Sequence, residues 1–108
     1  MQFWCDGGLH NICVTNDNGE FFLEKIDGTN NQNEYRSMIL ALTKASNGDT
    51  IYADSQLVVN QLTKNWKVKK AHLYPLFCEA KKLLESKTIN IEWVSRDFNR
   101  AGFILEGL

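Results

Sequence analysis

The stretch Thr50-Ile51-Tyr52-Ala53-Asp54-Ser55-Gln56-Leu57-Val58 decides how this chain folds. Residues 50–53 form a short apolar run that is typical of a buried strand, and apolar side chains at helical spacing follow over residues 55–63. A strand that leads directly into a helix indicates an α/β protein, in which helices pack on a sheet. Asp54 stands at the junction, where the strand ends.

Three strands are expected before this unit. Residues 2–6 and 11–15 are rich in side chains that favour strands. Asn16-Asp17-Asn18-Gly19 then carries the Asn-Gly signal of a tight hairpin, and a third strand is expected over residues 20–26. We therefore expect the chain to begin with three antiparallel strands.

Helices and strands alternate in the rest of the pattern. Thr29 begins a capping-box pattern, and apolar residues recur at helical spacing until Asn47-Gly48. A third helix is expected over residues 73–86, a last strand over 89–94, and a short terminal helix that Asn99 caps. Because helices separate the later strands, we expect a mixed sheet with helices packed on it.

The composition favours one small domain in a reducing compartment. With 108 residues, of which 44% are hydrophobic, the chain is expected to form a single domain over residues 1–108. Its cysteines have neither zinc-site spacing nor a CxxC pair, which favours reduced thiols. These are Cys5, Cys13 and Cys78. No signal peptide or membrane span is recognisable, so we expect a cytoplasmic monomer, with Trp4 and Trp93 in its core.

Three acidic residues lie where such a fold could gather them. Asp6, in Cys5-Asp6-Gly7-Gly8, and Asp54 both end strand-like runs, and Glu34 falls in the first turns of the helix that Thr29 begins. Carboxylates gathered at one rim would bind a hard divalent metal. For each residue alone, an exposed charge is the commoner role, and Asp54 could simply cap the helix that starts at Ser55.

A lysine-rich link is the second candidate site. The formal net charge is −1, so the protein as a whole does not attract nucleic acid, and any such affinity must come from a local patch. The link combines cations with one aromatic ring, as a surface that follows a nucleic-acid backbone would, although a solvated connection is the alternative. Its residues are Lys64, Trp66, Lys67, Lys69 and Lys70.

Four blocks of sequence, taken in order, resemble the type 1 ribonuclease H family. They are Cys5-Asp6-Gly7-Gly8, Thr29-Asn30-Asn31-x-x-Glu34, Ala53-Asp54-Ser55-Gln56-Leu57-Val58, and Trp93-Val94-x-Arg96-x-x-Asn99-x-Ala101. The resemblance implies a ribonuclease H-like fold with a five-stranded mixed sheet and an endonuclease that cleaves the RNA strand of an RNA/DNA hybrid. It also implies a site for Mg²⁺ or Mn²⁺, made from Asp6, Glu34, Asp54 and a fourth acidic residue.

The resemblance further implies which residues contact the hybrid. Polar residues at the starts of two helices resemble the hybrid-contacting residues of the family, and amide side chains can bond both base edges and ribose hydroxyls in the wide groove of an A-like duplex. They are Thr29, Asn30, Asn31 and Gln56. Thr29 and Asn30 could equally be helix caps. The resemblance also implies that the lysine-rich link corresponds to the basic substrate-binding segment of the family, called the handle. Its residues in this role are Trp66, Lys67, Lys69 and Lys70.

Two departures from the family pattern leave the activity open. The fourth aspartate is expected in an Asn-x-Ala-Asp pattern, where this chain has Asn99-Arg100-Ala101-Gly102, and Asp97 or Glu106 could replace it. The loop that often supplies a histidine is also missing. We therefore expect a metal-dependent endonuclease whose activity Gly102 could reduce, with a non-catalytic hybrid-binding domain as the alternative.

Overall fold

Strands and helices follow one another in the order that the sequence predicts. The computed structural model describes residues 1–108, and its elements are β1 (Gln2–Gly7), β2 (Asn11–Asn16), β3 (Phe21–Lys25), α1 (Asn30–Lys44), β4 (Thr50–Ala53), α2 (Gln56–Thr63), α3 (Tyr74–Glu85), β5 (Asn90–Trp93) and α4 (Arg100–Glu106). Two short 3₁₀ turns, Ala71–Leu73 and Arg96–Phe98, were not expected from the pattern.

The five strands form one mixed sheet in the order β3-β2-β1-β4-β5, which confirms the predicted fold class. β1, β2 and β3 pair antiparallel, whereas β4 pairs parallel with both β1 and β5. In the parallel pair Cys5 lies opposite Ala53, so the residues that follow, Asp6 and Asp54, are neighbours at the same end of the sheet.

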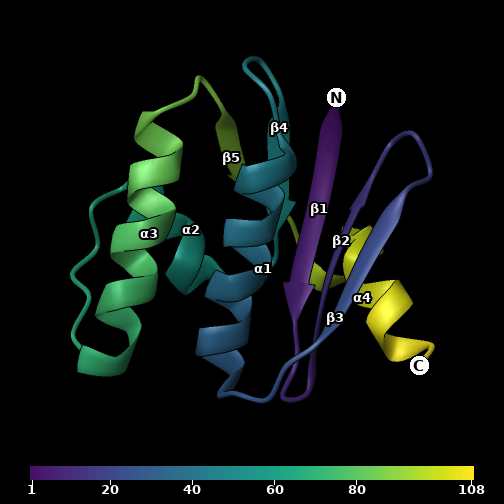
Figure 1. Cartoon of the computed structure of the whole chain (residues 1–108), viewed down its shortest axis with the longest axis horizontal. Helices are drawn as coiled ribbons and strands as arrows, with labels where there is room; N and C mark the ends of the chain where they lie inside the picture. Colours follow the sequence, from purple (N-terminus) through teal and green to yellow (C-terminus); the bar gives the residue numbers. More distant parts are fainter.

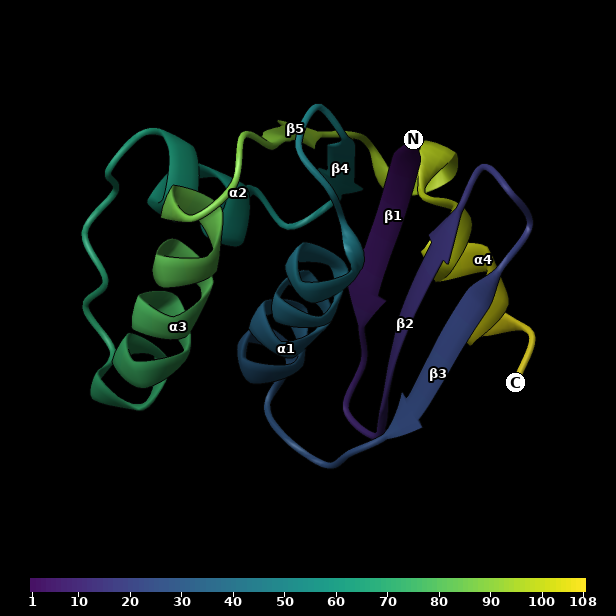
Figure 2. The same ribbon diagram turned by 45° about the horizontal axis from the view of Figure 1, so that its top comes forward.

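Helices cover both faces of the sheet (Figures 1 and 2). α1 crosses one face beside β1, and α3 packs against α1. The main core lies beneath α1 and includes Tyr35, Met38, Leu42 and Ile51, all fully buried. The short α4 contacts β1 and β2, and Figure 1 shows it behind them, on the other face. Asp6 therefore lies on the α4 face, because side chains alternate along β1 and Asp6 shares its face with Trp4 of the small core under α4.

The ends of α1 and α2 show how polar side chains fix the helix starts. Thr29 caps α1 with the predicted capping box, in which its hydroxyl accepts from the Gln32 amide and the Gln32 side chain accepts from the Thr29 amide. α1 ends at Lys44, three residues before the predicted stop at Asn47-Gly48. Ser55 is the cap of α2 rather than its first helical residue.

One of the two tryptophan predictions is wrong. Trp4 is buried, with 7% of its surface exposed, and stacks on Tyr52, but Trp93 is 46% exposed. Trp93 is the last residue of the edge strand β5, so its ring lies at the border of the sheet, and its indole N–H donates to the Asp54 carbonyl over 3.0 Å. Alternation along a strand predicts the face of a side chain but not whether the sheet continues beside it.

The cysteines are free, and Cys5 and Cys13 are buried as small apolar residues in the sheet. Burial raises the pKa of the Cys5 thiol well above its ordinary value, since it disfavours the thiolate. This supports the interpretation of Cys5 as a core residue rather than a metal ligand. None of the helices has both the length and the apolar character that a membrane span requires.

Candidate metal and nucleic-acid site

Three carboxylates from three different elements meet at one end of the sheet. One oxygen atom from each of Asp6, Glu34 and Asp54 lies within 4.8 Å of the other two. Asp6 belongs to β1, Glu34 to the second turn of α1, and Asp54 directly follows β4. The parallel pairing of β1 with β4, together with the packing of α1 on β1, therefore gathers the three acidic residues.

Gly7 allows α1 to approach β1 closely enough for this arrangement. Its amide donates to Glu34 Oε1 over 3.1 Å, in a buried hydrogen bond. A Cβ atom at this position would lie 2.3 Å from the main-chain carbon and oxygen of Asn33, nearer than two such atoms can approach. The glycine in Cys5-Asp6-Gly7-Gly8 thus fixes the distance between Glu34 and Asp6.

We expect Gly7→Ala to reduce the free energy of unfolding by about 2–4 kcal/mol, because the added methyl group must push α1 away from β1. Chemical denaturation followed by circular dichroism measures this. Gly8→Ala is the matched control, because a Cβ atom at Gly8 has only one neighbour, the Asn11 carbonyl oxygen at 3.9 Å. Equal stability of the two variants would contradict the close contact.

The metal-free cluster carries unsatisfied negative charge. Asp6 Oδ1 is buried and has no hydrogen-bond partner, which is rare for a buried polar atom. Burial, and then the nearby negative charge of Asp6, raises the pKa of Glu34 to about 9. Burial also raises the pKa of Asp6. An unpartnered carboxylate oxygen among two other carboxylates fits a hard divalent cation, which prefers oxygen ligands.

Asn99 has a role that the sequence did not reveal. Its side-chain oxygen accepts from the Ala101 amide over 3.1 Å, which confirms the predicted cap of α4. Its Nδ2 donates to the Cys5 carbonyl over 2.9 Å and to Asp54 Oδ2 over 3.2 Å. This buried side chain therefore joins α4, β1 and Asp54. In the sequence, only the position of Asn99 in a block that resembles the ribonuclease H family could have indicated a role beyond capping α4.

The alternative interpretation of Asp54 as a helix cap is wrong. The hydroxyl of Ser55 accepts from the Val58 amide over 3.2 Å and caps α2. The carboxylate of Asp54 instead accepts from Asn99, and one guanidinium nitrogen of Arg96 lies 3.9 Å away from it. The charge of Asp54 is therefore available to the cluster.

No acidic side chain takes the place of the expected fourth aspartate. Glu106 pairs with Arg96 over 3.3 Å and is half exposed, and Asp97 is exposed on its 3₁₀ turn. Gly102 is buried, and a Cβ atom there would lie 3.4 Å from Asp6 Oδ2, in ordinary contact. Position 102 thus faces the carboxylate cluster, but its residue brings no ligand.

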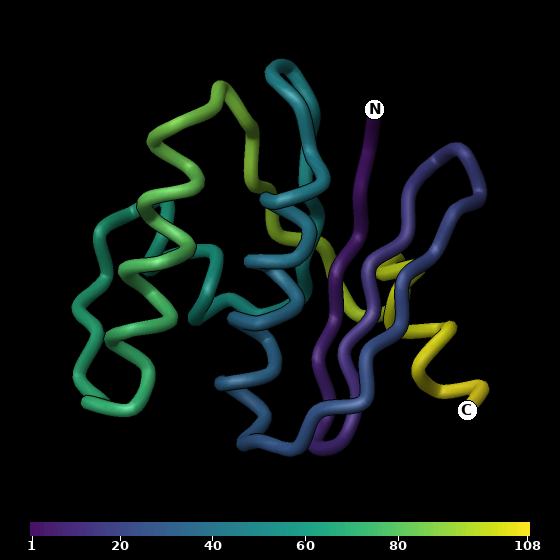
Figure 3. The backbone as a smooth tube through the Cα atoms, viewed as in Figure 1, coloured from purple at the N-terminus to yellow at the C-terminus, as the bar shows by residue number.

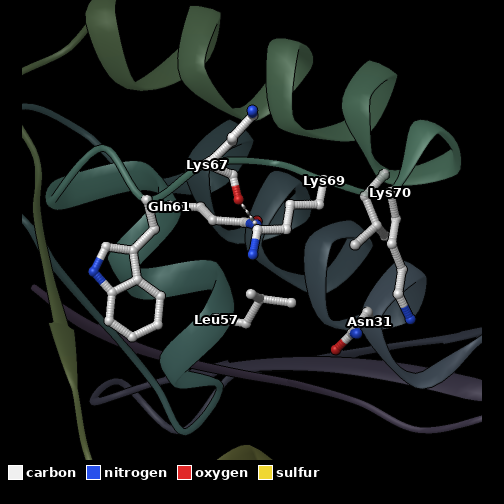
Figure 4. Close-up of a pocket in the computed structure, with 8 residues that line it drawn as sticks. Asn31, Leu57, Gln61, Lys67, Lys69 and Lys70 are labelled. Atoms are coloured by element: carbon white, nitrogen blue, oxygen red, sulfur yellow. Dashed lines mark hydrogen bonds between the residues drawn. The ribbon is translucent and has the colours of Figure 1, made fainter.

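The lysine-rich link lines a pocket of about 440 Å³ (Figure 4). Its walls contain five of the predicted substrate-binding residues together with two leucines and a glutamine: Asn31, Trp66, Lys67, Lys69, Lys70, Leu57, Leu73 and Gln61. The other three predicted residues lie outside the pocket and are exposed: Thr29 and Asn30 at the start of α1, and Gln56 at the start of α2. The pocket therefore joins the lysine-rich link to Asn31 of α1, whereas Thr29, Asn30 and Gln56 lie outside it.

The mixed sheet with acidic residues on β1, on α1 and after β4 defines the ribonuclease H-like class of fold. Residues 11–105 match the model of the family described as reverse transcriptase-like, and the chain belongs to this family. Over 76 residues, which are 66% of the chain, it is 40% identical to the bifunctional protein Rv2228c of Mycobacterium tuberculosis. The chain spans about a fifth of the length of that relative (21%).

Solved structures show the same fold. The N-terminal RNase H domain of Rv2228c from Mycobacterium tuberculosis superposes with a TM-score of 0.77 at 29% identity, covering 91% of this chain and 84% of that chain. RNase H1 from the halophilic archaeon Halobacterium salinarum gives a TM-score of 0.80 at 26% identity, covering 96% and 92%. LC11-RNase H1, solved in complex with an RNA/DNA hybrid, shares the fold with a TM-score of 0.77 at 21% identity, covering 92% and 88%.

Proposed function

We propose that this chain is a metal-dependent endonuclease that hydrolyses the RNA strand of RNA/DNA hybrids. The observation that carries the proposal is the cluster of Asp6, Glu34 and Asp54, in which a buried oxygen of Asp6 lacks any partner. Relatives that carry the name RNase H share the fold and support the substrate class.

Asp6, Glu34 and Asp54 are the proposed metal ligands and catalytic residues. When bound, Mg²⁺ or Mn²⁺ would supply an activated water and stabilise the charge that develops during phosphodiester hydrolysis. Asp6 has the central place, since it interacts with both Glu34 and Asp54 and its unpartnered oxygen can donate a lone pair to a metal ion. Gly7 and Asn99 hold the carboxylates of Glu34 and Asp54 in position through the hydrogen bonds described above.

The polar helix starts are the proposed sensors of RNA. Thr29, Asn30 and Asn31 begin α1, which carries Glu34, and Gln56 follows Asp54 by two residues. Their side chains thus lie close in sequence to the carboxylates, and amides can recognise ribose hydroxyls in an A-like groove without reading the base sequence. Because Thr29 also caps α1, its hydroxyl would serve both roles.

Cleavage of a labelled RNA/DNA hybrid, titrated with each metal, tests the proposal. We expect cleavage with Mg²⁺ or Mn²⁺ and none in chelator, while single-stranded RNA and duplex DNA stay intact. Mn²⁺ should support faster cleavage, because it is less strict than Mg²⁺ about ligand geometry. Absence of cleavage in both metals would contradict the proposal.

A non-catalytic hybrid-binding domain is the second candidate, and Gly102 is the observation that favours it. This position faces Asp6 but supplies no carboxylate, so one metal ligand is missing from the set that the family resemblance implies. Tight binding of the hybrid without cleavage in either metal would select this function.

The lysines of the pocket should contribute affinity without selectivity, because a lysine meets phosphate as a point charge. We expect Lys67→Ala, Lys69→Ala and Lys70→Ala together to weaken binding to every duplex. The slope of log K against log salt should flatten by roughly 1 to 3. Fluorescence anisotropy at several salt concentrations measures this, and Lys25→Ala with Lys82→Ala, exposed elsewhere, is the control. An unchanged slope would assign these lysines to a solvated connection.

A further inference from the structure

A buried glutamine connects the lysine-rich link to the core. Gln61 lies on α2 with only 2% of its surface exposed. Its Oε1 accepts from the hydroxyl of Tyr35, which is fully buried in α1, and its Nε2 donates to the Lys67 carbonyl over 3.2 Å. Figure 4 shows the second bond crossing from the pocket wall to the link. The three residues form a relay from α1, through α2, to the link.

The relay holds the centre of a segment that has little other support. The link between α2 and the 3₁₀ turn contains no helix or strand. At its first end the Lys64 and Trp66 amides donate to the Asn60 carbonyl, and at its far end the Lys70 carbonyl accepts from Leu73. Between these ends lie Lys67, Val68 and Lys69. The bond from Gln61 to the Lys67 carbonyl is the only hydrogen bond that the main chain of these three residues makes.

The orientation of the link follows from two contacts. Val68 packs against the main core, while the bond from Gln61 fixes the preceding peptide at Lys67. Lys67 and Lys69, on either side of Val68, are exposed and line the pocket. Val68 alone would leave this segment free to turn about one apolar anchor, whereas the second contact fixes its direction.

We propose that Gln61 is a positioning residue for substrate binding: it orders the link before the hybrid arrives, so that the lysines are already placed around the pocket. This inference rests on the proposed function, because it assumes that the link contacts the hybrid. An ordered link binds with a smaller entropic cost than a mobile one. Loss of one such hydrogen bond should weaken binding by about threefold to tenfold.

The double variant Tyr35→Phe/Gln61→Met tests the inference. It replaces both polar partners with apolar side chains of similar shape, so that no buried hydroxyl is left unsatisfied and the fold is kept. We expect the NMR order parameters of the Val68 and Lys69 amides to fall from about 0.85, typical of a rigid backbone, to below about 0.6. KM for the hybrid should rise by about threefold to tenfold, while kcat and Mn²⁺ affinity, measured by calorimetry, stay unchanged. Tyr35→Phe alone is the matched control, because Gln61 can still donate to Lys67.

Several outcomes separate this inference from the proposed function. Unchanged order parameters in the link, with unchanged order parameters in β1 and α1, would overturn the positioning role in a correctly folded protein. A rise in KM for the triple lysine-to-alanine variant, without one for the double variant, would also overturn it. If the triple variant leaves KM unchanged, the proposed contact between the link and the hybrid is wrong, and the order parameters alone then decide whether Gln61 orders the link.

Discussion

Asp6→Asn is expected to reduce hybrid cleavage by about a thousandfold or more, roughly 4 kcal/mol of barrier, while it makes the metal-free protein more stable. Cleavage falls because Asp6 is the central member of the carboxylate cluster. Stability rises because the amide removes a charge that is buried beside Glu34 and has an unpartnered oxygen. A residue kept for the fold alone would not show this opposite pair of effects.

The gain in stability should depend on pH in a defined direction. Burial and Asp6 raise the pKa of Glu34 from 4.5 to about 9, so between these values the folded protein holds a proton that the unfolded chain has released. The contribution of Glu34 to the stability of the metal-free protein is therefore fully present below about pH 4.5 and is lost as pH rises through 9. Asp6→Asn should weaken this decline and add on the order of 1 kcal/mol near pH 8.

Denaturation in chelator at several pH values, together with the cleavage assay, measures both effects. Asp97→Asn is the matched control, because Asp97 is exposed and lies outside the cluster, and it should change neither property. Added Mg²⁺ should restore the stability of the native protein at high pH, since a metal ion replaces the proton among the carboxylates. A native protein whose stability does not change with pH would show that the carboxylates are better solvated than their burial indicates.

Gly102→Asp is expected to increase Mg²⁺-dependent cleavage by about tenfold or more, because it places a fourth carboxylate beside Asp6. The close approach of a Cβ atom at position 102 to Asp6 Oδ2, 3.4 Å, puts the new side chain within reach of the cluster. Without metal the same substitution should lower stability, since it adds a like charge to buried carboxylates. Asp6→Asn and Gly102→Asp should therefore have opposite effects on both properties.

Gly102→Ala distinguishes the effect of an added carboxylate from the effect of a more stable α4 helix. Alanine at the third position of α4 should stabilise the protein by up to about 1 kcal/mol without increasing cleavage. Equal cleavage by the glycine, alanine and aspartate forms would mean that the site does not use a fourth carboxylate at this position. Loss of that activity on Glu106→Gln would then show that Glu106 leaves its pairing with Arg96 to act at the cluster.

Local chemistry explains which parts of the site could be predicted. The capping box at Thr29 and the Asn99 cap need only neighbouring residues, and the structure has both. The short apolar runs predicted strands that end near Asp6 and Asp54, and the helical pattern that begins at Thr29 placed Glu34 in the first turns of α1. The cap of α2 was ambiguous, because Asp54 and Ser55 are adjacent and both residue types cap helices. Only the position of each side chain in the folded protein selected Ser55.

Local patterns in the sequence were enough to predict the order of the elements, the mixed α/β class and the three acidic residues of the candidate site. Tertiary structure alone decided the raised pKa of Glu34, the exposure of Trp93, and the second role of Asn99. It also decided that Gln61, at a position of α2 between Leu57 and Leu62, is buried as a hydrogen-bond partner rather than exposed. The physical reason is range: caps and periodicity act within a few residues, whereas burial, charge coupling and the Gln61 relay depend on residues that only folding brings together.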